Sequence, residues 1–335
     1  MISETILDRL EVERARARSA KSLIEQLEPE LEQAVAGLET TRSMDQIQAD
    51  AYWPKWDGPW WQMQTLLSVG AADMIPIQAV CATLERIESG SLKFFPLREV
   101  EIPDGTDPYR DILCHCALAS LDLLVGGRGG SLDERFPWVR GWYLRYQLPD
   151  GGLNCDEAVY TRPKPHSSMV STLPVMESLL SRHETWSPAE VQAVDAGARY
   201  LMTRSLCRSV SGGNRIIDQD WMVPAFPRFY EYDILRGLAF LARWAHLRGL
   251  PLPSHSLEEA LACLHAFFSD ESAAPRHIPG SEGTTLRQSA SGEWGRGAFG
   301  SFRLLGRVMD ATISRSFLRL EYIRTLEDLA KAHLD

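Results

Sequence analysis

Residues 147–180 read QLPDGGLNCDEAVYTRPKPHSSMVSTLPVMESLL, and this stretch decides the fold. Its first part, Pro149 to Gly152, predicts a turn, because proline ends a preceding helix and Asp-Gly-Gly adopts left-handed backbone at little cost. Its second part predicts a helix from Ser167, since an N-cap serine satisfies free backbone N–H groups and apolar residues follow at helical spacing. Between the two parts lie polar side chains that a plain connection does not need: Cys155, Asp156, Glu157 and His166.

A unit of two helices recurs along the chain. In each unit an aromatic or polar loop leads into an apolar helix, and a turn then leads into a more amphipathic helix. Successive first helices begin roughly 50 to 70 residues apart, which is typical of helix-pair repeats with insertions. The expected pairs are 60–69 with 75–87, 111–125 with 133–146, 167–180 with 188–203, 230–244 with 256–268, and 298–313 with 317–333.

The first helix of each pair is the more apolar one. Residues 112–125, ILCHCALASLDLLV, and residues 232–244, YDILRGLAFLARW, are examples. A helix that is apolar on nearly all sides is buried, so we expect the first helices to form an inner ring and the second helices an outer ring. The loops that enter the inner helices would then face a central cavity, and we expect the chemistry there.

The segments QLPDGGLNC (147–155) and HSSMVSTLPVMESLL (166–180) resemble one repeat of the terpenoid cyclase and protein prenyltransferase superfamily. The first segment resembles the Gln/Trp repeat motif, with Leu153 where a Trp is usual. The resemblance implies an all-α toroid of five or six helix pairs. It also implies an enzyme that cyclises, isomerises or prenylates an isoprenoid-like substrate. The chain departs from the family because it carries neither a DxDD motif nor a DDxxD-type magnesium cluster.

The remaining segments frame the repeats. Residues 1–50 carry an apolar stripe among many charges, and we expect a helical hairpin packed on a toroid domain of residues 51–335; the alternative is an arm that binds a partner. The Trp-rich stretch 52–61 predicts a loop, because proline and glycine interrupt it. Residues 92–101 are either a short hairpin arm or a loop. The glycine-rich stretch 280–300 predicts a long loop that could cover the cavity.

Composition restricts the class of partner. The chain has 335 residues and a net charge of -10, without a basic stripe of interleaved aromatics, which argues against nucleic acid and anionic membranes as partners. The N-terminus lacks an apolar signal core, and no apolar run reaches the roughly 20 residues that span a bilayer. The 6 cysteines include no CxxC pair, which indicates reduced thiols. We therefore expect a cytoplasmic protein with a small apolar substrate.

Two acidic positions are candidate catalytic groups. Asp233 lies near the start of an inner helix among aromatic residues, where a carboxyl group could act as general acid or base. Its alternative role is to stabilise the N-terminus of that helix. Asp220 forms a DxD pattern with Asp218, and two such carboxylates could hold a metal ion such as magnesium or divide acid and base roles. The alternative is a solvated loop.

Cys155 and His166 suggest a metal site. The protein prenyltransferases of the superfamily hold catalytic zinc with Asp, Cys and His, and His166 stands at a place that resembles their zinc histidine. Asp156 is the candidate third ligand, with Cys114 and His115 as alternatives. Zinc favours such a tetrahedral set and leaves one position open when it is catalytic. Alternatively, His166 caps the helix, and Cys155 packs as a small apolar residue.

Cys114, His115 and Cys116 follow one another within an expected inner helix. Neighbouring residues of a helix point in different directions. At most one or two of the three side chains could therefore face one site, and the pattern favours a buried helix.

Aromatic residues gather ahead of the inner helices. Their faces can stabilise carbocations by cation–π attraction, and they also suit an ordinary core. We expect them to line an aromatic cavity. The candidate substrate-binding residues are Trp60, Trp61, Tyr109, Tyr230, Tyr232 and Trp221.

Three functions remain open from the sequence. The first is an enzyme for an isoprenoid-like substrate, with Asp233, Asp220 and His166 as catalytic acid and base candidates. The second is a metal-dependent enzyme of another class, centred on Cys155 and His166 and using zinc or magnesium. The third is a non-catalytic binding or scaffold protein, because one fold hosts many functions.

Overall fold

The computed structural model describes residues 2–89, 93–95, 112–279, 283–289 and 291–332. Helices dominate these residues, and the strands form only two short pairs, so the expected all-α class is confirmed. In this part of the chain, no helix has both the length and the hydrophobicity that crossing a membrane requires. The α-helices are α1 (Ile2–Glu25), α2 (Glu28–Leu38), α3 (Thr41–Ala49), α4 (Pro59–Ser68), α5 (Ile77–Ser89), α6 (His115–Gly127), α7 (Val139–Arg145), α8 (Met169–Ser181), α9 (Pro188–Thr203), α10 (Ile234–Arg248), α11 (Glu258–Ser269), α12 (Arg303–Val308) and α13 (Ala311–Lys331).

The first helix of a pair is buried on nearly all sides, as the sequence pattern indicates. In α6 every residue from His115 to Val125 is buried except Leu123. The second helices are amphipathic. In α5, for example, Val80 is buried while Ile77 is exposed.

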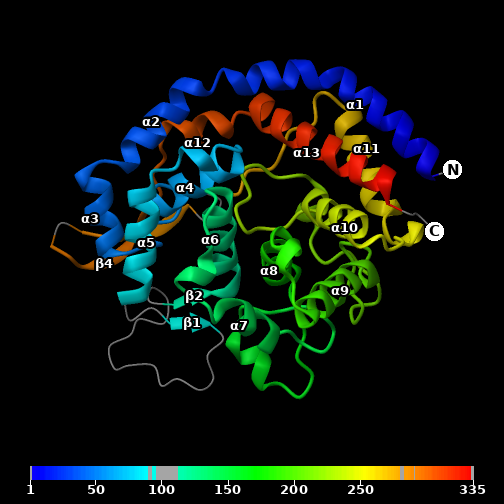
Figure 1. Ribbon diagram of the computed structural model, residues 1–335. Coiled ribbons are helices and arrows are strands. Elements are labelled where there is room, and N and C mark those ends of the chain that lie inside the picture. Colours follow the sequence, from blue (N-terminus) through cyan, green and yellow to red (C-terminus); the bar gives the residue numbers. More distant parts are fainter. Residues whose placement is uncertain (1, 90–92, 96–111, 280–282, 290, 333–335) are drawn as a thin grey trace.

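The buried helices contact one another in succession (Figure 1). Helix α4 packs against α6, α6 against α8, α8 against α10, and α10 against α13. Helix α12 contacts both α13 and α4, so the succession of contacts returns to its start. Helix α9 packs on α8 and α10, and α11 packs on α10.

In place of the expected N-terminal hairpin, α1 and α2 run end to end along one arc over α13 and α12 (Figure 1). Helix α1 packs along α13, and α2 packs against α12 and α4. The connection is too short and too helical to reverse the chain. Leu27, between the two helices, has αR backbone, and its N–H donates to the Ile24 carbonyl oxygen at 3.0 Å.

The predicted boundaries of the helix over residues 298–313 are wrong. A short α12 ends at Val308, and the long α13 begins at Ala311. Asp310 causes the break, because its carboxylate accepts the N–H groups of Thr312 and Ile313 at 3.0 and 3.2 Å and caps a new helix.

The long loop expected over residues 280–300 contains an antiparallel hairpin instead. Strand β3 (Thr284–Gln288) pairs with β4 (Trp294–Ala298). An ion pair between Arg287 of β3 and Asp57 ties the hairpin to the Trp-rich loop. This contact is distant in sequence, which is why the local pattern of glycines did not indicate it.

A second strand pair leads into α6. Strand β1 (Lys93–Phe95) pairs in parallel with β2 (Ile112–Cys114), and β2 runs directly into the helix. The helix expected from residue 111 therefore begins at His115. Of the stretch 92–101, only β1 lies within the described residues.

Candidate active site: a cluster of three thiols

The turn that precedes Cys155 is fixed by glycine and glutamine. Gly151 has φ of 92°, and a Cβ atom at this position would clash with the carbonyl oxygen of Ala196 on α9. The amide Nε2 of Gln147 donates to the carbonyl oxygens of Gly151 and Ala193 at 2.7 and 2.8 Å. The Gln and Gly positions of the motif therefore hold this loop tightly against α9.

The segment after the turn is pinned to the start of α8. The N–H of Ser168 donates to the Leu153 carbonyl oxygen at 2.8 Å, and the N–H of Leu153 donates to Oγ1 of Thr172 at 2.8 Å. The N–H of Cys155 donates to Oγ of Ser171 at 3.1 Å. These bonds bring Cys155 to the first turn of α8.

Two further cysteines reach the same place from the start of α6. Cys114 is the N-cap residue of α6 and has extended backbone, with φ of -78° and ψ of 161°. Its Sγ lies 2.9 Å from Sγ of Cys116, and Cys155 is near enough to Cys116 for each thiol to shift the pKa of the other. We call Cys114, Cys116 and Cys155 the thiol cluster. Cys155 is exposed, Cys114 is half-buried and Cys116 is buried.

Hydrogen bonding distributes the protons of the thiol cluster unequally. The bond from Cys116 lowers the pKa of Cys155 to about 6, and a bond from the Ser171 hydroxyl acts in the same direction. The bond from Cys116 also lowers the pKa of Cys114. The bonds to its two neighbours, together with burial, raise the pKa of Cys116 well above its usual value. At neutral pH Cys155 is therefore a thiolate, while Cys116 keeps its proton.

The distance between the Cys114 and Cys116 sulfurs differs from that of two cysteines bound to one zinc ion. Zn–S distances of about 2.3 Å in a tetrahedron place two bound sulfurs roughly 3.8 Å apart. The Cys114 and Cys116 sulfurs are closer, at 2.9 Å, which is shorter than the separation of two sulfurs bound to one zinc ion. Of the expected ligands, Asp156 caps the next 3₁₀ turn, and His166 lines a pocket to which Cys155 does not contribute. Among the described residues, no group of three or more His, Cys, Asp or Glu side chains is arranged to hold a metal ion.

Two tyrosines lie beside the thiol cluster. The hydroxyl groups of Tyr52 and Tyr230 are 2.9 Å apart. Burial raises the pKa of both well above the usual value, and the charges of nearby cysteines add to this effect. Both phenols therefore keep their protons at neutral pH. Among the described residues, Tyr230 is an expected substrate-binding aromatic whose pKa is raised by a cysteine of the thiol cluster.

Other expected aromatics have packing roles. Trp60 and Trp61 are buried, with 1% and 0% of their surface exposed. Tyr232 is also buried, and its hydroxyl donates to a backbone carbonyl oxygen at 2.6 Å. Tyr109 lies outside the described residues.

The two expected catalytic aspartates lie in unlike surroundings. Asp233 is buried at the N-cap of α10, where its carboxylate accepts the N–H groups of Arg236 and Ala225 at 2.8 and 2.9 Å. It also accepts a hydrogen bond from the Arg228 guanidinium at 2.8 Å. The capping role considered for Asp233 is therefore the one observed. Asp220 is exposed on a 3₁₀ turn.

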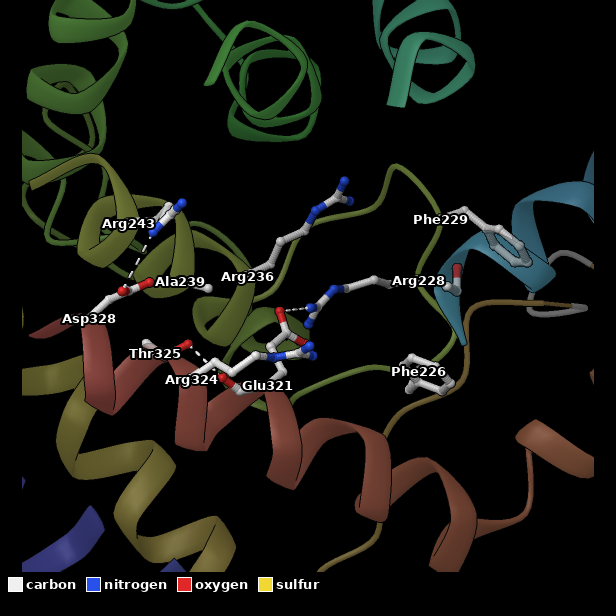
Figure 2. Close-up of a pocket in the computed structure, with 11 residues that line it drawn as sticks. Phe226, Arg228, Phe229, Arg236, Ala239, Arg243, Glu321, Arg324, Thr325 and Asp328 are labelled. Carbon is white, nitrogen blue, oxygen red and sulfur yellow. Dashed lines mark hydrogen bonds and ion pairs between the residues drawn. The ribbon is translucent and has the colours of Figure 1, made fainter. Parts of the chain in front are cut away.

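A cavity of about 400 Å³ lies between α10, α13 and the end of α4. Figure 2 shows its arginines, which are Arg228, Arg236, Arg243 and Arg324. Arg228 forms an ion pair with Glu321 of α13. Although burial opposes its charge, Asp233 and Glu321 raise the pKa of Arg228. Arg236 pairs with Glu177 of α8 at 2.6 Å. These ion pairs connect α8, α10 and α13, so the charges around the cavity hold the buried helices together.

A larger pocket, of about 750 Å³, lies beside the start of α8. It brings together two expected site residues, His166 and Trp221. On one side of the pocket, the Arg204 guanidinium stacks on the ring of Tyr200 at 3.9 Å and pairs with Asp150 at 2.9 Å. The cysteines of the thiol cluster are not among the residues that line this pocket.

The sequence offered Cys114 beside Cys155 only as an alternative metal ligand, and it did not place Cys116 there. Within one helix, at most one or two of Cys114, His115 and Cys116 could face one site. In the structure α6 begins just after Cys114, so its side chain lies ahead of the helix and meets Cys116. The available signal was the position of this CxC pattern at the start of an apolar helix.

The chain matches no protein-family model, no curated protein and no solved structure. The thiol cluster is therefore the starting point for its function.

Proposed function

We propose that the chain is an enzyme that uses Cys155 as a nucleophile. The observation that carries this proposal is the thiol cluster, in which Cys155 is exposed, is held at the first turn of α8 by Ser171, and has its pKa lowered by the buried Cys116. The thiolate and not the thiol attacks electrophiles, and covalent catalysis requires such an activated nucleophile. A cysteine that only packs needs neither exposure nor a buried donor.

We propose the α/α toroid as the architecture that presents this nucleophile. The succession of contacts from α4 through α6, α8, α10, α13 and α12 back to α4 supports a closed ring of buried helices. The thiol cluster then lies at the loops that enter α6 and α8. This is the end of the ring at which the helix-pair pattern predicts chemistry.

The substrate of this proposal has an apolar part. Tyr52 and Tyr230, whose hydroxyl groups are 2.9 Å apart, are near enough to the thiol cluster for its charges to raise their pKa values, and Tyr52 packs edge-on against Trp53 and Trp60 at 5.3 and 5.6 Å between ring centroids. Aromatic walls of this kind favour apolar ligands. An isoprenoid-like compound, which the family resemblance implies, is one substrate that this surface would accept.

Site-selective alkylation tests the proposed nucleophile. Full-length protein is treated at neutral pH with a limiting amount of iodoacetamide, and mass spectrometry identifies the modified peptides. We expect Cys155 to react ahead of Cys81, which is exposed on α5 outside the thiol cluster. Cys116→Ala removes the donor and should slow the labelling of Cys155 by on the order of tenfold. Cys116→Ser keeps a donor and should preserve most of the rate.

Cys263 supplies the matched control, because it is a half-buried cysteine on α11. Cys263→Ala should leave the labelling of Cys155 unchanged. Equal labelling rates for Cys155 and Cys81 in the unsubstituted protein would overturn the proposed nucleophile.

A further inference from the structure

We propose that the thiol cluster is a relay for thiol–disulfide exchange and that its substrate is a small disulfide. The proposal rests on the proposed function, because Cys155 is the attacking group, and it adds the substrate class and the fate of the covalent adduct. Its basis is the order of the sulfurs. Cys155 is exposed and interacts with the buried Cys116, and the half-buried Cys114 lies 2.9 Å from Cys116, so Cys116 is the thiol that links the other two.

The contact between Cys114 and Cys116 is already close to a covalent geometry. Their sulfurs are 2.9 Å apart. A disulfide bond is about 2.05 Å long, so bond formation requires a shift of about 1 Å. A nucleophilic enzyme needs a single thiol, whereas this site gathers three of the chain's 6 cysteines, two of them in direct contact. The two additional thiols can supply the two electrons that reduce a substrate disulfide.

The first step is attack by the Cys155 thiolate on a substrate disulfide, R–S–S–R′. A bond forms between Cys155 Sγ and the sulfur of R, the substrate S–S bond breaks, and R′–S⁻ leaves. R′–S⁻ then takes the proton of Cys116 and departs as R′–SH. The Cys116 thiolate attacks Cys155 Sγ and expels R–S⁻, which leaves a disulfide between Cys116 and Cys155.

The last step restores the nucleophile. The thiolate of Cys114 attacks Cys116 Sγ, so a Cys114–Cys116 disulfide forms and Cys155 is released as a thiolate. Overall the substrate disulfide gains two electrons and becomes R′–SH and R–S⁻, which takes a proton from water, and the pair Cys114 and Cys116 loses two electrons. An external dithiol reductant then returns this pair to its reduced form by the same exchange chemistry.

The experiment uses full-length protein with Cys81→Ser, which removes the exposed cysteine outside the thiol cluster. The probe is 2,2′-dithiodipyridine, a neutral aromatic disulfide whose released thione is measured by absorbance. The relay predicts two thiones for each thiol cluster, no pyridyl adduct on Cys155, and a Cys114–Cys116 disulfide in the peptide map. In the Cys116→Ser variant, we expect one thione and a stable pyridyl adduct on Cys155.

Cys114→Ser should stop the relay one step later, before the last exchange. It therefore tests the relay independently, even if Cys116→Ser does not fold. It should release two thiones and stop at a Cys116–Cys155 disulfide. A stable pyridyl adduct on Cys155 in the otherwise unsubstituted cluster, without an internal disulfide, would overturn the relay and leave the nucleophile intact. A Cys155 that does not react with the probe at all would overturn both proposals.

Discussion

The sulfur atoms of Cys114 and Cys116 lie 2.9 Å apart, although a single residue separates the two cysteines. Two helical residues at this spacing would point away from each other. Cys114 avoids this because it is the N-cap residue of α6 and has extended backbone. The junction between β2 and α6 thus pairs two thiols, and the loop before α8 adds Cys155 as the exposed third.

The turn at Gly151 should be sensitive to substitution. Gly151→Ala places a Cβ at φ of 92° against the Ala196 carbonyl oxygen, and we expect the free energy of unfolding to fall by about 1 to 3 kcal/mol. Urea denaturation measures this loss. The matched control is Gly306→Ala in α12, where an added Cβ meets no atom within 4 Å. It should be neutral or stabilise the protein by up to about 1 kcal/mol, and equal losses in the two variants would contradict the account of this turn.

Glu13 should be needed to hold α1 against α13. Its carboxylate is buried, with 0% of its surface exposed, and it lies 2.6 Å from the guanidinium of Arg9 and 3.5 Å from that of Arg319 on α13. Glu13→Ala removes the buried carboxylate between Arg9 and Arg319. These arginines keep Ser269 and Glu271 as partners, so we expect a loss of about 3 kcal/mol in the free energy of unfolding. Glu11→Ala, at an exposed position of α1, should change it by less than about 0.5 kcal/mol. Urea denaturation of both variants checks this, and two equally small changes would show that the buried carboxylate does not hold α1.

Substitution of the two expected catalytic aspartates should lower the free energy of unfolding by different amounts. Asp233→Asn weakens a cap and a buried ion pair with Arg228, and we expect it to lower the free energy of unfolding by about 2 kcal/mol. Asp220→Asn, at an exposed position, should have an effect below about 0.5 kcal/mol. Both variants should label Cys155 at the rate of the unsubstituted protein. A slower rate in folded Asp220→Asn would return this aspartate to the active site.

Local signals predicted much of the fold. Helix α9 spans Pro188–Thr203 as expected, because the capping box of Ser187 and Glu190 marks its start within the local sequence. Boundaries were wrong where a single side chain redirects the backbone, as Asp310 does between α12 and α13. The hairpin of β3 and β4 was missed because its anchor, Asp57, lies far away in the sequence.

The site was only partly predictable for the same reason. Cys155 was a candidate because of its place in the loop before an inner helix. Its neighbour Asp156 caps a turn, and His166 faces another pocket. The actual partners, Cys114 and Cys116, lie at the junction of β2 and the preceding buried helix, and the packing of α6 on α8 brings them near Cys155. No local pattern encodes such a contact.

The pH dependence of the alkylation of Cys155 tests the central claim most directly. The hydrogen bond from Cys116 lowers the pKa of Cys155 to about 6, so the thiolate is present above that pH and is lost as the pH falls through it. We predict that the rate rises with a midpoint near pH 6 and that Cys116→Ala moves the midpoint up toward about 8.5, the value of a free cysteine. A midpoint near about 8.5 in the unsubstituted protein, unchanged by the substitution, would contradict the account.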